Sequence, residues 1–263
     1  MRRPSLRARL AALPPERLLL FLDFDGTLTP IVRRPDEARL AGSVRRLLRL
    51  LVRSMPVVVV SGRALADLQR RVRVPEVRYV ACHGLLYKEP GAAVRWLGRR
   101  VSRKEVRRWV RALEMAAVGT PGALIEDKGL SAALHDRTVS RTSRGRLRRR
   151  ALRALAPWIQ RGAVTLVRGK RVLEVRPAGP WNKGAAVAGL LKKGWARRRL
   201  PVYFGDDRTD FDAFRVLQGS GVAVRVGGRR GVAGEDAWLR SPDAVSSLLR
   251  WLQKRTEAGD QRA

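Results

Sequence analysis

Short apolar runs recur along the chain, and the first one, Leu18 to Leu22, leads directly into Asp23 and Asp25. Five consecutive apolar residues predict a strand that is buried on both faces, as in a parallel sheet. Further apolar runs predict strands at Val57–Val60, Val77–Cys82, Val202–Phe204 and Val222–Val226. We expect these strands to form one sheet.

Segments between the strands have helical spacing. Apolar residues from Leu40 to Leu51 predict a helix over Asp36 to Arg53, Asn182 is placed to begin another, and a last helix is expected from Pro242 to Lys254. Strands that alternate with helices in this way are typical of an α/β fold with a parallel sheet.

The middle of the chain has a different pattern. Helices are predicted at Arg103–Val118 and Arg144–Ile159, beside strands in 123–135, 164–167 and 171–175. Helices next to hairpin-like strands indicate a small α+β sheet. We therefore expect residues 102–179 to be an inserted cap domain, and residues 1–101 and 180–263 to form the core.

Carboxylates follow two of the predicted core strands. Asp23 and Asp25 end the first, and Asp206, Asp207 and Asp210 follow Gly205 after another. Since ligands of open α/β sheets bind at the carboxyl ends of the strands, these acids predict a Mg²⁺ site there. Two simpler interpretations stay open: an exposed turn at the first site, and acids that stabilise a helix N-terminus at Asp207 and Asp210.

Two further positions suit phosphate chemistry. The Ser61-Gly62-Arg63 turn offers a hydroxyl and backbone amides to a phosphate oxygen, although Ser61 is equally suited to cap a helix. Lys183 stands out because only 8 of the 56 basic residues are lysines, and a compact ammonium can contact both a carboxylate and a phosphoryl oxygen. A chance surface lysine is the alternative.

The formal net charge of +33 over 263 residues favours anionic partners, but the arginines are scattered along the chain. Seven arginines fall within Arg141–Arg153, where Leu147 and Leu152 interrupt them at helical spacing, so we favour an amphipathic helix with solvated arginines over a nucleic-acid-binding arm. The single Cys82 and the lack of a long apolar segment lead us to expect a soluble cytoplasmic protein that binds no membrane.

These motifs, in this order, resemble the haloacid dehalogenase superfamily of phosphatases. The resemblance implies a Rossmann-like parallel-sheet core with an inserted α+β cap. It implies that Asp23 is the nucleophile, that Asp25 is the general acid and base, and that Ser61 and Lys183 hold the transferring oxygens. Asp23, Asp206 and the backbone carbonyl of Asp25 would bind Mg²⁺.

Additional motifs narrow the resemblance to the trehalose-6-phosphate phosphatase family: Asp23 to Ile31, His83-Gly84, Glu126-Asp127-Lys128 with His135 and Arg137, Glu174 to Pro177, and Asn182-Lys183-Gly184. Phe211 and Leu85-Leu86 depart from it, because acids are common in the family at these places. By this resemblance, the substrate is contacted by Thr27, Gly62, Arg63, Glu126, Lys128, His135, Glu174, Asp207 and Asp210.

The resemblance therefore implies hydrolysis of trehalose 6-phosphate to trehalose and phosphate through an aspartyl phosphate. The alternatives are a phosphatase for sucrose phosphate or mannosyl-phosphoglycerate, or a catalytically idle, basic protein that binds nucleic acid or membrane. We expect a monomer whose partner is the small-molecule substrate, with no specific nucleic-acid partner.

Overall fold

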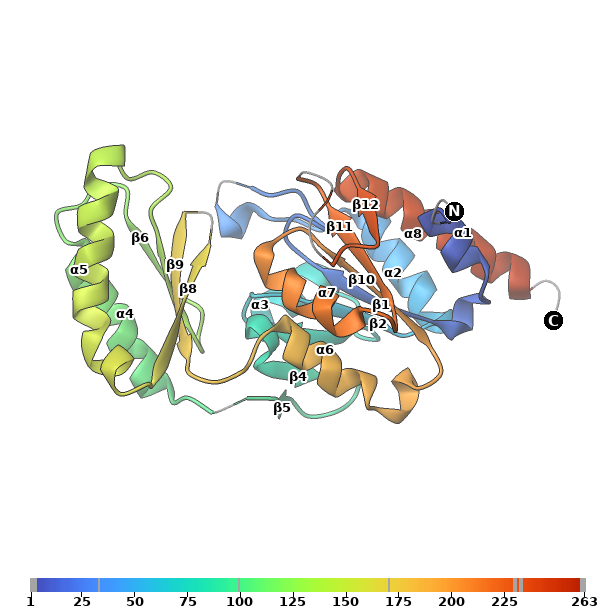
Figure 1. Ribbon diagram of the computed structural model, residues 1–263, viewed down its shortest axis with the longest axis horizontal. Helices are drawn as coiled ribbons and strands as arrows, with labels where there is room; N and C mark the ends of the chain where they lie inside the picture. Colours follow the sequence, from blue (N-terminus) through green and yellow to red (C-terminus); the bar gives the residue numbers. More distant parts are fainter. Residues whose placement is uncertain are drawn as a thin grey trace. The chain divides into compact units, whose positions relative to one another are not determined.

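The computed structural model describes residues 4–32, 34–98, 100–169, 171–228, 231 and 234–260, and the chain divides into two compact units. Unit 1 contains Met1–Leu97 and Trp181–Ala263, and unit 2 is the continuous stretch Gly98–Pro180. The chain thus leaves unit 1 once, forms unit 2, and returns to unit 1 (Figure 1). The bounds lie within a few residues of the predicted insert.

Unit 1 is built on an eight-stranded sheet with the order β12-β11-β10-β1-β2-β3-β4-β5. Neighbours from β12 to β3 are parallel, whereas β3, β4 and β5 pair antiparallel at one edge. The strands are β1 (Leu18–Asp23), β2 (Val57–Val60), β3 (Arg78–Ala81), β4 (Leu86–Lys88), β5 (Arg95–Trp96), β10 (Leu200–Gly205), β11 (Val222–Val226) and β12 (Ala237–Leu239).

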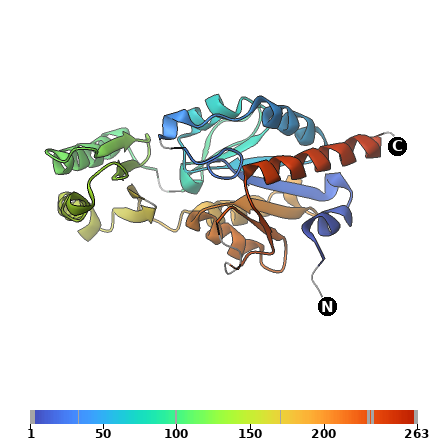
Figure 2. The same ribbon diagram turned by 90° about the horizontal axis from the view of Figure 1, so that it is seen from above.

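Helices cover both faces of this sheet. α6 (Lys183–Leu191) and α7 (Phe211–Leu217) pack on the face that carries Phe21 and Tyr203. α2 (Gly42–Ser54) and α8 (Pro242–Asp260) contact each other on the opposite side (Figure 2). The remaining helices of unit 1 are α1 (Leu6–Ala11) and α3 (Leu65–Val72). The expected helical layers of an α/β fold are therefore present.

Strand β1 lies at the centre of the sheet, and all six of its residues are buried. It pairs in parallel with β10 on one side and with β2 on the other, where Asp23 is in register with Val60. Burial on both faces explains why the strand is a continuous apolar run. The carboxyl ends of β1, β2 and β10 consequently meet at one edge of the sheet.

Two details differ from the sequence-based expectation. The predicted helix from Asp36 is a short 3₁₀ turn over Pro35–Glu37, and α2 begins only at Gly42 because the backbone at Ala38 is extended. Strands β4, β5 and β12 were not predicted, since they are only two or three residues long and carry no clear alternation. The structure therefore contains a mixed sheet rather than a purely parallel one.

Unit 2 is an antiparallel sheet with the order β6-β7-β9-β8, covered on one face by two helices. Trp109 of one helix and Leu147 of the other pack against Leu134 and Leu173 of the sheet. The elements are α4 (Arg103–Ala117), β6 (Leu124–Asp127), β7 (Ala132–His135), α5 (Arg141–Gln160), β8 (Val164–Gly169) and β9 (Val172–Pro177). This is the α+β arrangement that the sequence predicts.

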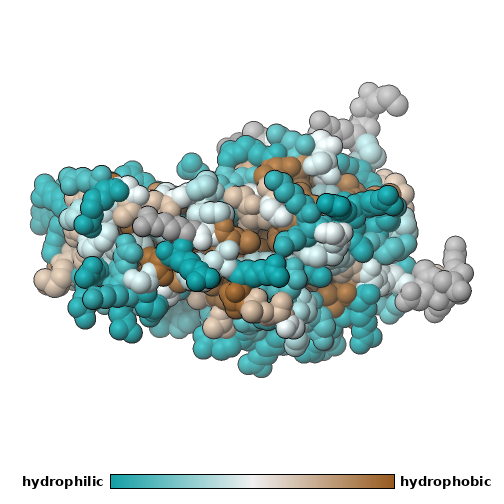
Figure 3. All heavy atoms as spheres, turned by 90° about the horizontal axis from the view of Figure 1, so that it is seen from below, coloured by the Kyte–Doolittle hydropathy of each residue, from teal (hydrophilic) through white to brown (hydrophobic). Residues whose placement is uncertain are grey.

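The surface is dominated by polar side chains. Figure 3 shows hydrophilic residues over most of the visible face, with hydrophobic residues in scattered patches. On α5, Leu147 is buried and Leu152 partly buried, while Arg146, Arg149 and Arg153 are exposed, as the amphipathic interpretation predicts. Among the helices that the structure describes, none has the length and apolar character required to span a membrane.

Candidate active site

The carboxyl end of β1 holds a buried ionic network. Lys183, the first residue of α6, places its Nζ 2.6 Å from Asp23 Oδ1 and 2.7 Å from Asp210 Oδ1. Asn182 caps the helix by accepting a hydrogen bond from the amide of Ala185, which fixes the start of α6 and therefore the position of Lys183. Lys183 is 3% exposed, so its ammonium is bound by carboxylates rather than solvated by bulk water.

Asp210 anchors this network from the other side. Its Oδ1 also accepts the hydroxyl hydrogen of Tyr203 at 2.7 Å, and its Oδ2 accepts the amide hydrogen of Asp207 at 3.0 Å. Asp207 and Asp210 form a reciprocal capping box at the turn that precedes α7. The interpretation of Asp207 and Asp210 as acids at a helix N-terminus therefore describes their geometry. Asp210 is fully buried.

Asp206 joins the cluster because Gly26 lies beside it. Gly26 has φ +86°, and a Cβ at this position would collide with the Asp206 carboxylate. A glycine thus both makes the turn after Asp25 and allows the second acidic segment to approach β1. Carboxylate oxygens of Asp23, Asp206 and Asp210 come within 4.8 Å of one another.

The ionisation of these groups follows from their burial. Burial raises the pKa of Asp206 to about 7, with a further contribution from Asp210, and it raises the pKa of Asp23 well above 3.8 against the opposing effect of Lys183. Burial alone would lower the pKa of Lys183, but Asp210 and Asp23 reverse the effect and raise it. Lys183 therefore stays an ammonium, whereas burial disfavours the charged forms of the Asp23 and Asp206 carboxyl groups unless further positive charge is present.

Asp25 is held by a different cation. The guanidinium of Arg63 donates to both oxygens of Asp25, from Nε at 2.7 Å and from Nη2 at 2.6 Å. Arg63 also donates to Asp67 at 2.9 Å and to the carbonyl of Pro35 at 2.8 Å. Burial by itself would lower the pKa of Arg63, but its two carboxylate partners outweigh this effect and raise it. The Asp25 side chain is nevertheless 41% exposed.

The Ser61 turn lies next to Asp23, because Val60 is the register partner of Asp23. Ser61 is buried, and its Oγ accepts the amide hydrogen of Arg63 at 3.1 Å, so its own hydrogen can be donated elsewhere. A Cβ on Gly62 would collide with the ring of His83, which explains the glycine. Thr27 is fully buried, and in the described part of the chain its hydroxyl has no hydrogen-bond partner.

In unit 2, the predicted sugar-binding residues gather on one face of the sheet. Glu126 and Glu174 are both in register with Ala133, whereas the helices pack on the alternate residues, such as Leu134 and Leu173. Side chains alternate between the two faces of a sheet, so the acids lie on the face opposite the helices.

Lys128 and His135 complete this group. Lys128, directly after β6, has its Nζ 3.6 Å from Glu174 and 4.0 Å from Glu126, and His135 Nε2 is 2.8 Å from Glu126. Burial alone would raise the pKa of Glu126, but the hydrogen bond with His135 and the charge of Lys128 lower it. Two carboxyl groups, a lysine amine and an imidazole thus share one patch.

Three members of these networks were not predicted. Tyr203 binds Asp210, while Ser131 donates to Glu174 Oε1 at 2.9 Å and Arg176 donates to its Oε2 at 2.9 Å. Tyr203 is the one polar side chain in its apolar strand, which is a usable signal, whereas nothing in the local sequence distinguishes Ser131.

The structure also places the residues that depart from the family pattern. Phe211 lies under the guanidinium of Arg225, 5.1 Å from the ring centroid, so the aromatic ring takes an arginine as neighbour where an acid is usual. Leu85 and Leu86 are buried, and Leu86 belongs to the antiparallel edge strand β4.

The chain has the fold of haloacid dehalogenase-like hydrolases. A haloacid dehalogenase-like hydrolase from Bacteroides thetaiotaomicron has a TM-score of 0.65 to the chain at 14% identity, covering 89% of this chain and 99% of the other, which shows the shared fold. The trehalose-phosphatase family model matches residues 21–231. The chain belongs to the trehalose-phosphatase family.

Individual relatives agree with this membership. The chain is 30% identical to probable trehalose-phosphate phosphatase 3 of Oryza sativa subsp. japonica over 95% of this chain and 73% of the relative. The C-terminal domain of the C. albicans trehalose-6-phosphate phosphatase has a TM-score of 0.81 at 25% identity, and the match covers 96% of this chain and 98% of that domain.

Proposed function

We propose that the protein hydrolyses trehalose 6-phosphate to trehalose and inorganic phosphate. The observation that carries this proposal is the buried contact of Lys183 with Asp23 at the carboxyl end of β1, beside Asp206 and Ser61, in a chain of the trehalose-phosphatase family. Phosphoryl transfer depends mainly on alignment and on neutralising charge, and this site supplies a nucleophile, a cation and hydrogen-bond donors for both purposes.

In this proposal a carboxylate oxygen of Asp23 attacks phosphorus, and the bond from phosphorus to the sugar oxygen breaks. Asp25 gives its proton to the departing sugar oxygen, leaving an aspartyl phosphate on Asp23. Asp25 then takes a proton from water, whose oxygen attacks phosphorus and releases phosphate from Asp23. Lys183 and the Ser61 hydroxyl hold phosphoryl oxygens throughout.

The residues at the site fit a Mg²⁺ ion. Their donor atoms are all oxygens, and the raised pKa values of Asp23 and Asp206 show carboxylates placed together in surroundings that need additional positive charge. Asp23, Asp206 and the backbone carbonyl of Asp25 would hold the ion. Asp210 is already occupied by Lys183 and Tyr203. When bound, the ion supplies positive charge to the phosphoryl oxygens.

Arg63 has a different role here from the substrate contact expected at first. Its two hydrogen bonds orient the Asp25 carboxylate, which is the form that takes the proton from water, so we assign Arg63 the positioning of Asp25 for that step. Asp210 likewise acts through Lys183, because it is buried and its oxygens are bound within the protein, and Asp207 supports Asp210 through the capping box. Gly62 and Thr27 remain candidates for phosphate contacts through backbone and hydroxyl groups.

Unit 2 would bind the sugar. Carboxylates accept hydrogen bonds from vicinal hydroxyls and an ammonium donates them, so Glu126, Glu174, Lys128 and His135 are suited to a disaccharide. The uncharged, hydroxyl-rich half of the substrate thus has a partner of matching chemistry. A cytoplasmic location fits the single cysteine, Cys82, which is buried.

A phosphate-release assay with Mg²⁺ tests the proposal across trehalose 6-phosphate, sucrose phosphate, mannosyl-phosphoglycerate and glucose 6-phosphate. We expect kcat/KM to be highest for trehalose 6-phosphate by at least about tenfold, equivalent to one good hydrogen bond to a charged group. A higher value for another sugar phosphate would change the assigned substrate, and no release from any of them would contradict the proposal.

Metal binding has a readout that needs no turnover. Adding Mg²⁺ to metal-free protein should raise Tm, because a ligand that binds only the folded state stabilises it by about 2.7 kcal/mol at a hundredfold excess over Kd. Asp206→Asn should lose this shift, whereas Asp243→Asn, at an exposed position of α8, should keep it. An equal shift in both variants would contradict the assigned ligands.

A further inference from the structure

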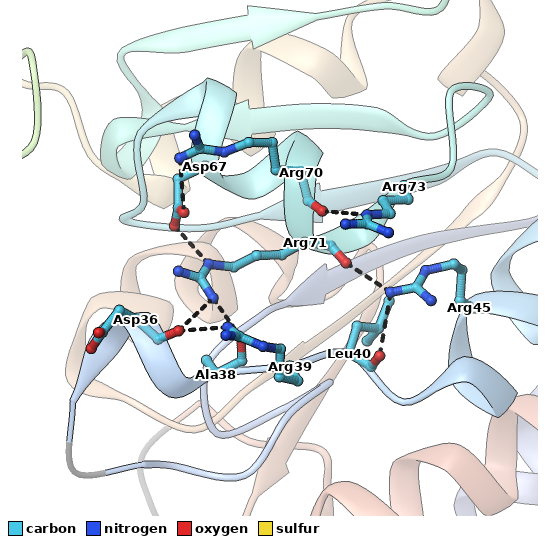
Figure 4. A pocket seen from close by; sticks show the side chains of 9 residues that line it. All are labelled: Asp36, Ala38, Arg39, Leu40, Arg45, Asp67, Arg70, Arg71 and Arg73. Atoms are coloured by element: carbon cyan, nitrogen blue, oxygen red, sulfur yellow. Dashed lines mark hydrogen bonds and ion pairs between the residues drawn. The ribbon is translucent and has the colours of Figure 1, made fainter.

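A cavity of about 440 Å³ lies in unit 1, and five of the nine residues that line it are arginines (Figure 4). Arg39 comes from the loop before α2, Arg45 from α2, Arg70 and Arg71 from α3, and Arg73 from the end of α3. The other lining residues are Asp36, Ala38, Leu40 and Asp67. None of the residues assigned to phosphoryl transfer lines this cavity.

Several of these arginines are fixed in place by backbone carbonyls. Arg45 donates to the carbonyls of Val72 at 2.9 Å and Arg71 at 3.2 Å, and Arg71 donates to the carbonyl of Ala38 at 2.5 Å. Arg73 donates from Nε to the carbonyl of Arg70 at 3.0 Å. Bonds to neutral carbonyls orient a guanidinium without cancelling its charge, and five N–H groups per arginine leave donors available.

The acids near the cavity do not balance this charge. Asp67 is within 2.9 Å of Arg63 as well as 2.8 Å from Arg71, so its charge is shared with an arginine outside the cavity. The Asp36 carboxylate is bound by Arg34, also outside it. The five lining arginines therefore carry a surplus of positive charge in a recess, where the field of several charges adds.

We propose that this cavity binds a small anion with at least two phosphate groups, at a site separate from the phosphatase centre. Guanidinium groups recognise phosphate through paired hydrogen bonds, and arginines from a loop and two helices can contact two phosphates together. The described lining has no aromatic side chain on which a nucleobase could stack, which favours a non-nucleotide ligand. This inference is independent of the proposed sugar substrate.

Calorimetric titration with inorganic pyrophosphate tests the site in magnesium-free buffer at about 0.15 M salt, where diffuse attraction is screened. The double variant Arg39→Gln/Arg70→Gln removes two exposed arginines, one from the loop before α2 and one from α3, and Arg70 is 77% exposed, so the fold should be preserved. The matched control Arg146→Gln/Arg149→Gln removes the same charge from exposed positions on α5.

We expect the cavity variant to weaken pyrophosphate binding by about tenfold or more, and the control by less than about threefold. Equal weakening in both would show diffuse attraction, and unchanged affinity in the cavity variant would place the anion elsewhere, such as the phosphatase centre; either result would overturn the proposal. So would binding of inorganic phosphate as tightly as pyrophosphate. Titration with fructose 1,6-bisphosphate distinguishes a sugar-borne from an inorganic source of the two phosphates.

Discussion

The two units each contain a lysine between acids, but the two lysines are held very differently. In unit 1, Lys183 is 3% exposed and lies 2.6 and 2.7 Å from its carboxylate partners. In unit 2, the Lys128 side chain is 15% exposed, and its distances to Glu174 and Glu126 are 3.6 and 4.0 Å. Lys183 is held by short hydrogen bonds, whereas Lys128 makes longer charge contacts.

This difference fits two different tasks. A transition state gains most from groups that are fixed before the reaction begins, because no energy is then spent on reorienting them. A sugar has many hydroxyls to satisfy, and groups that are only partly occupied can exchange their protein partners for those hydroxyls. The short contacts of Lys183 and the longer contacts of Lys128 therefore fit the proposed roles in chemistry and in sugar recognition.

The largest effect should come from the nucleophile. Asp23→Asn removes the attacking carboxylate, so turnover of trehalose 6-phosphate should fall by at least about a thousandfold. Circular dichroism should show an intact fold. Asp243→Asn, the same change on the exposed surface of α8, should keep normal activity. Substantial activity in folded Asp23→Asn would contradict the mechanism.

Replacing Lys183 should also cause a large loss of folding stability. Lys183→Met leaves Asp23 and Asp210 buried without their cation, and breaking a buried ion pair costs about 3–5 kcal/mol. Urea denaturation would measure the free energy of unfolding. Lys192→Met removes the same charge from an exposed position at the end of α6 and should cost less than about 1 kcal/mol. Similar losses in both variants would show that the network contributes little stability.

Substitutions of Lys128 and Glu174 should slow the hydrolysis of one substrate and leave that of another nearly unchanged. Lys128→Ala should lower kcat/KM for trehalose 6-phosphate by about tenfold to a thousandfold, and Glu174→Ala should act in the same direction, because remote contacts position the phosphate. Hydrolysis of para-nitrophenyl phosphate, which has no disaccharide, should change little.

Lys104→Ala, at an exposed position of α4, is the matched control for this lysine and should leave both substrates unaffected. An equal loss on both substrates in Lys128→Ala would assign this lysine to the chemical step or to the fold. No loss on either would remove the sugar-binding role of unit 2.

The smallest effect concerns the pH dependence of stability in unit 2. The pKa of Glu126 is lowered in the folded state, so its contribution is present above about 4.5 and is lost as pH falls through the lower folded value. Because this side chain is 34% exposed, Glu126→Gln should cost less than about 1 kcal/mol at pH 7. Urea denaturation at pH 7 and below pH 4 should show the difference from wild type shrinking with acid, and a growing difference would contradict the shift.

The central strand and its acids could be predicted because their signal is local. A strand buried on both faces must be apolar throughout, so the strand at Leu18 to Leu22 can be predicted without knowledge of its neighbours. The carboxyl-end rule then places Asp23 and Asp206 together from the order of elements alone. Lys183 was identified because lysine is rare in this chain.

The remaining features depend on contacts between distant residues. Strand β12 forms only where β11 offers an edge, and Arg63 meets Asp25 across 38 positions of sequence. Residue type alone does not reveal whether an acid lies beside a metal, a helix terminus or a lysine. For Asp210, this depends on residues that are distant in the sequence. The start of α2 was misplaced because helical spacing continues through Leu40, although the backbone at Ala38 is extended.

Unit 1 is formed by two stretches of the chain that are synthesised before and after unit 2. Leu18 of β1 pairs with Leu200 of β10, so the central strand pair cannot form until the ribosome has passed the whole of unit 2. All four strands of unit 2 lie between Leu124 and Pro177, and they are available earlier. Domains generally fold as units while the chain emerges. The sheet of unit 2 can therefore close first, while β1 has β2 available on one side and still lacks β10 on the other.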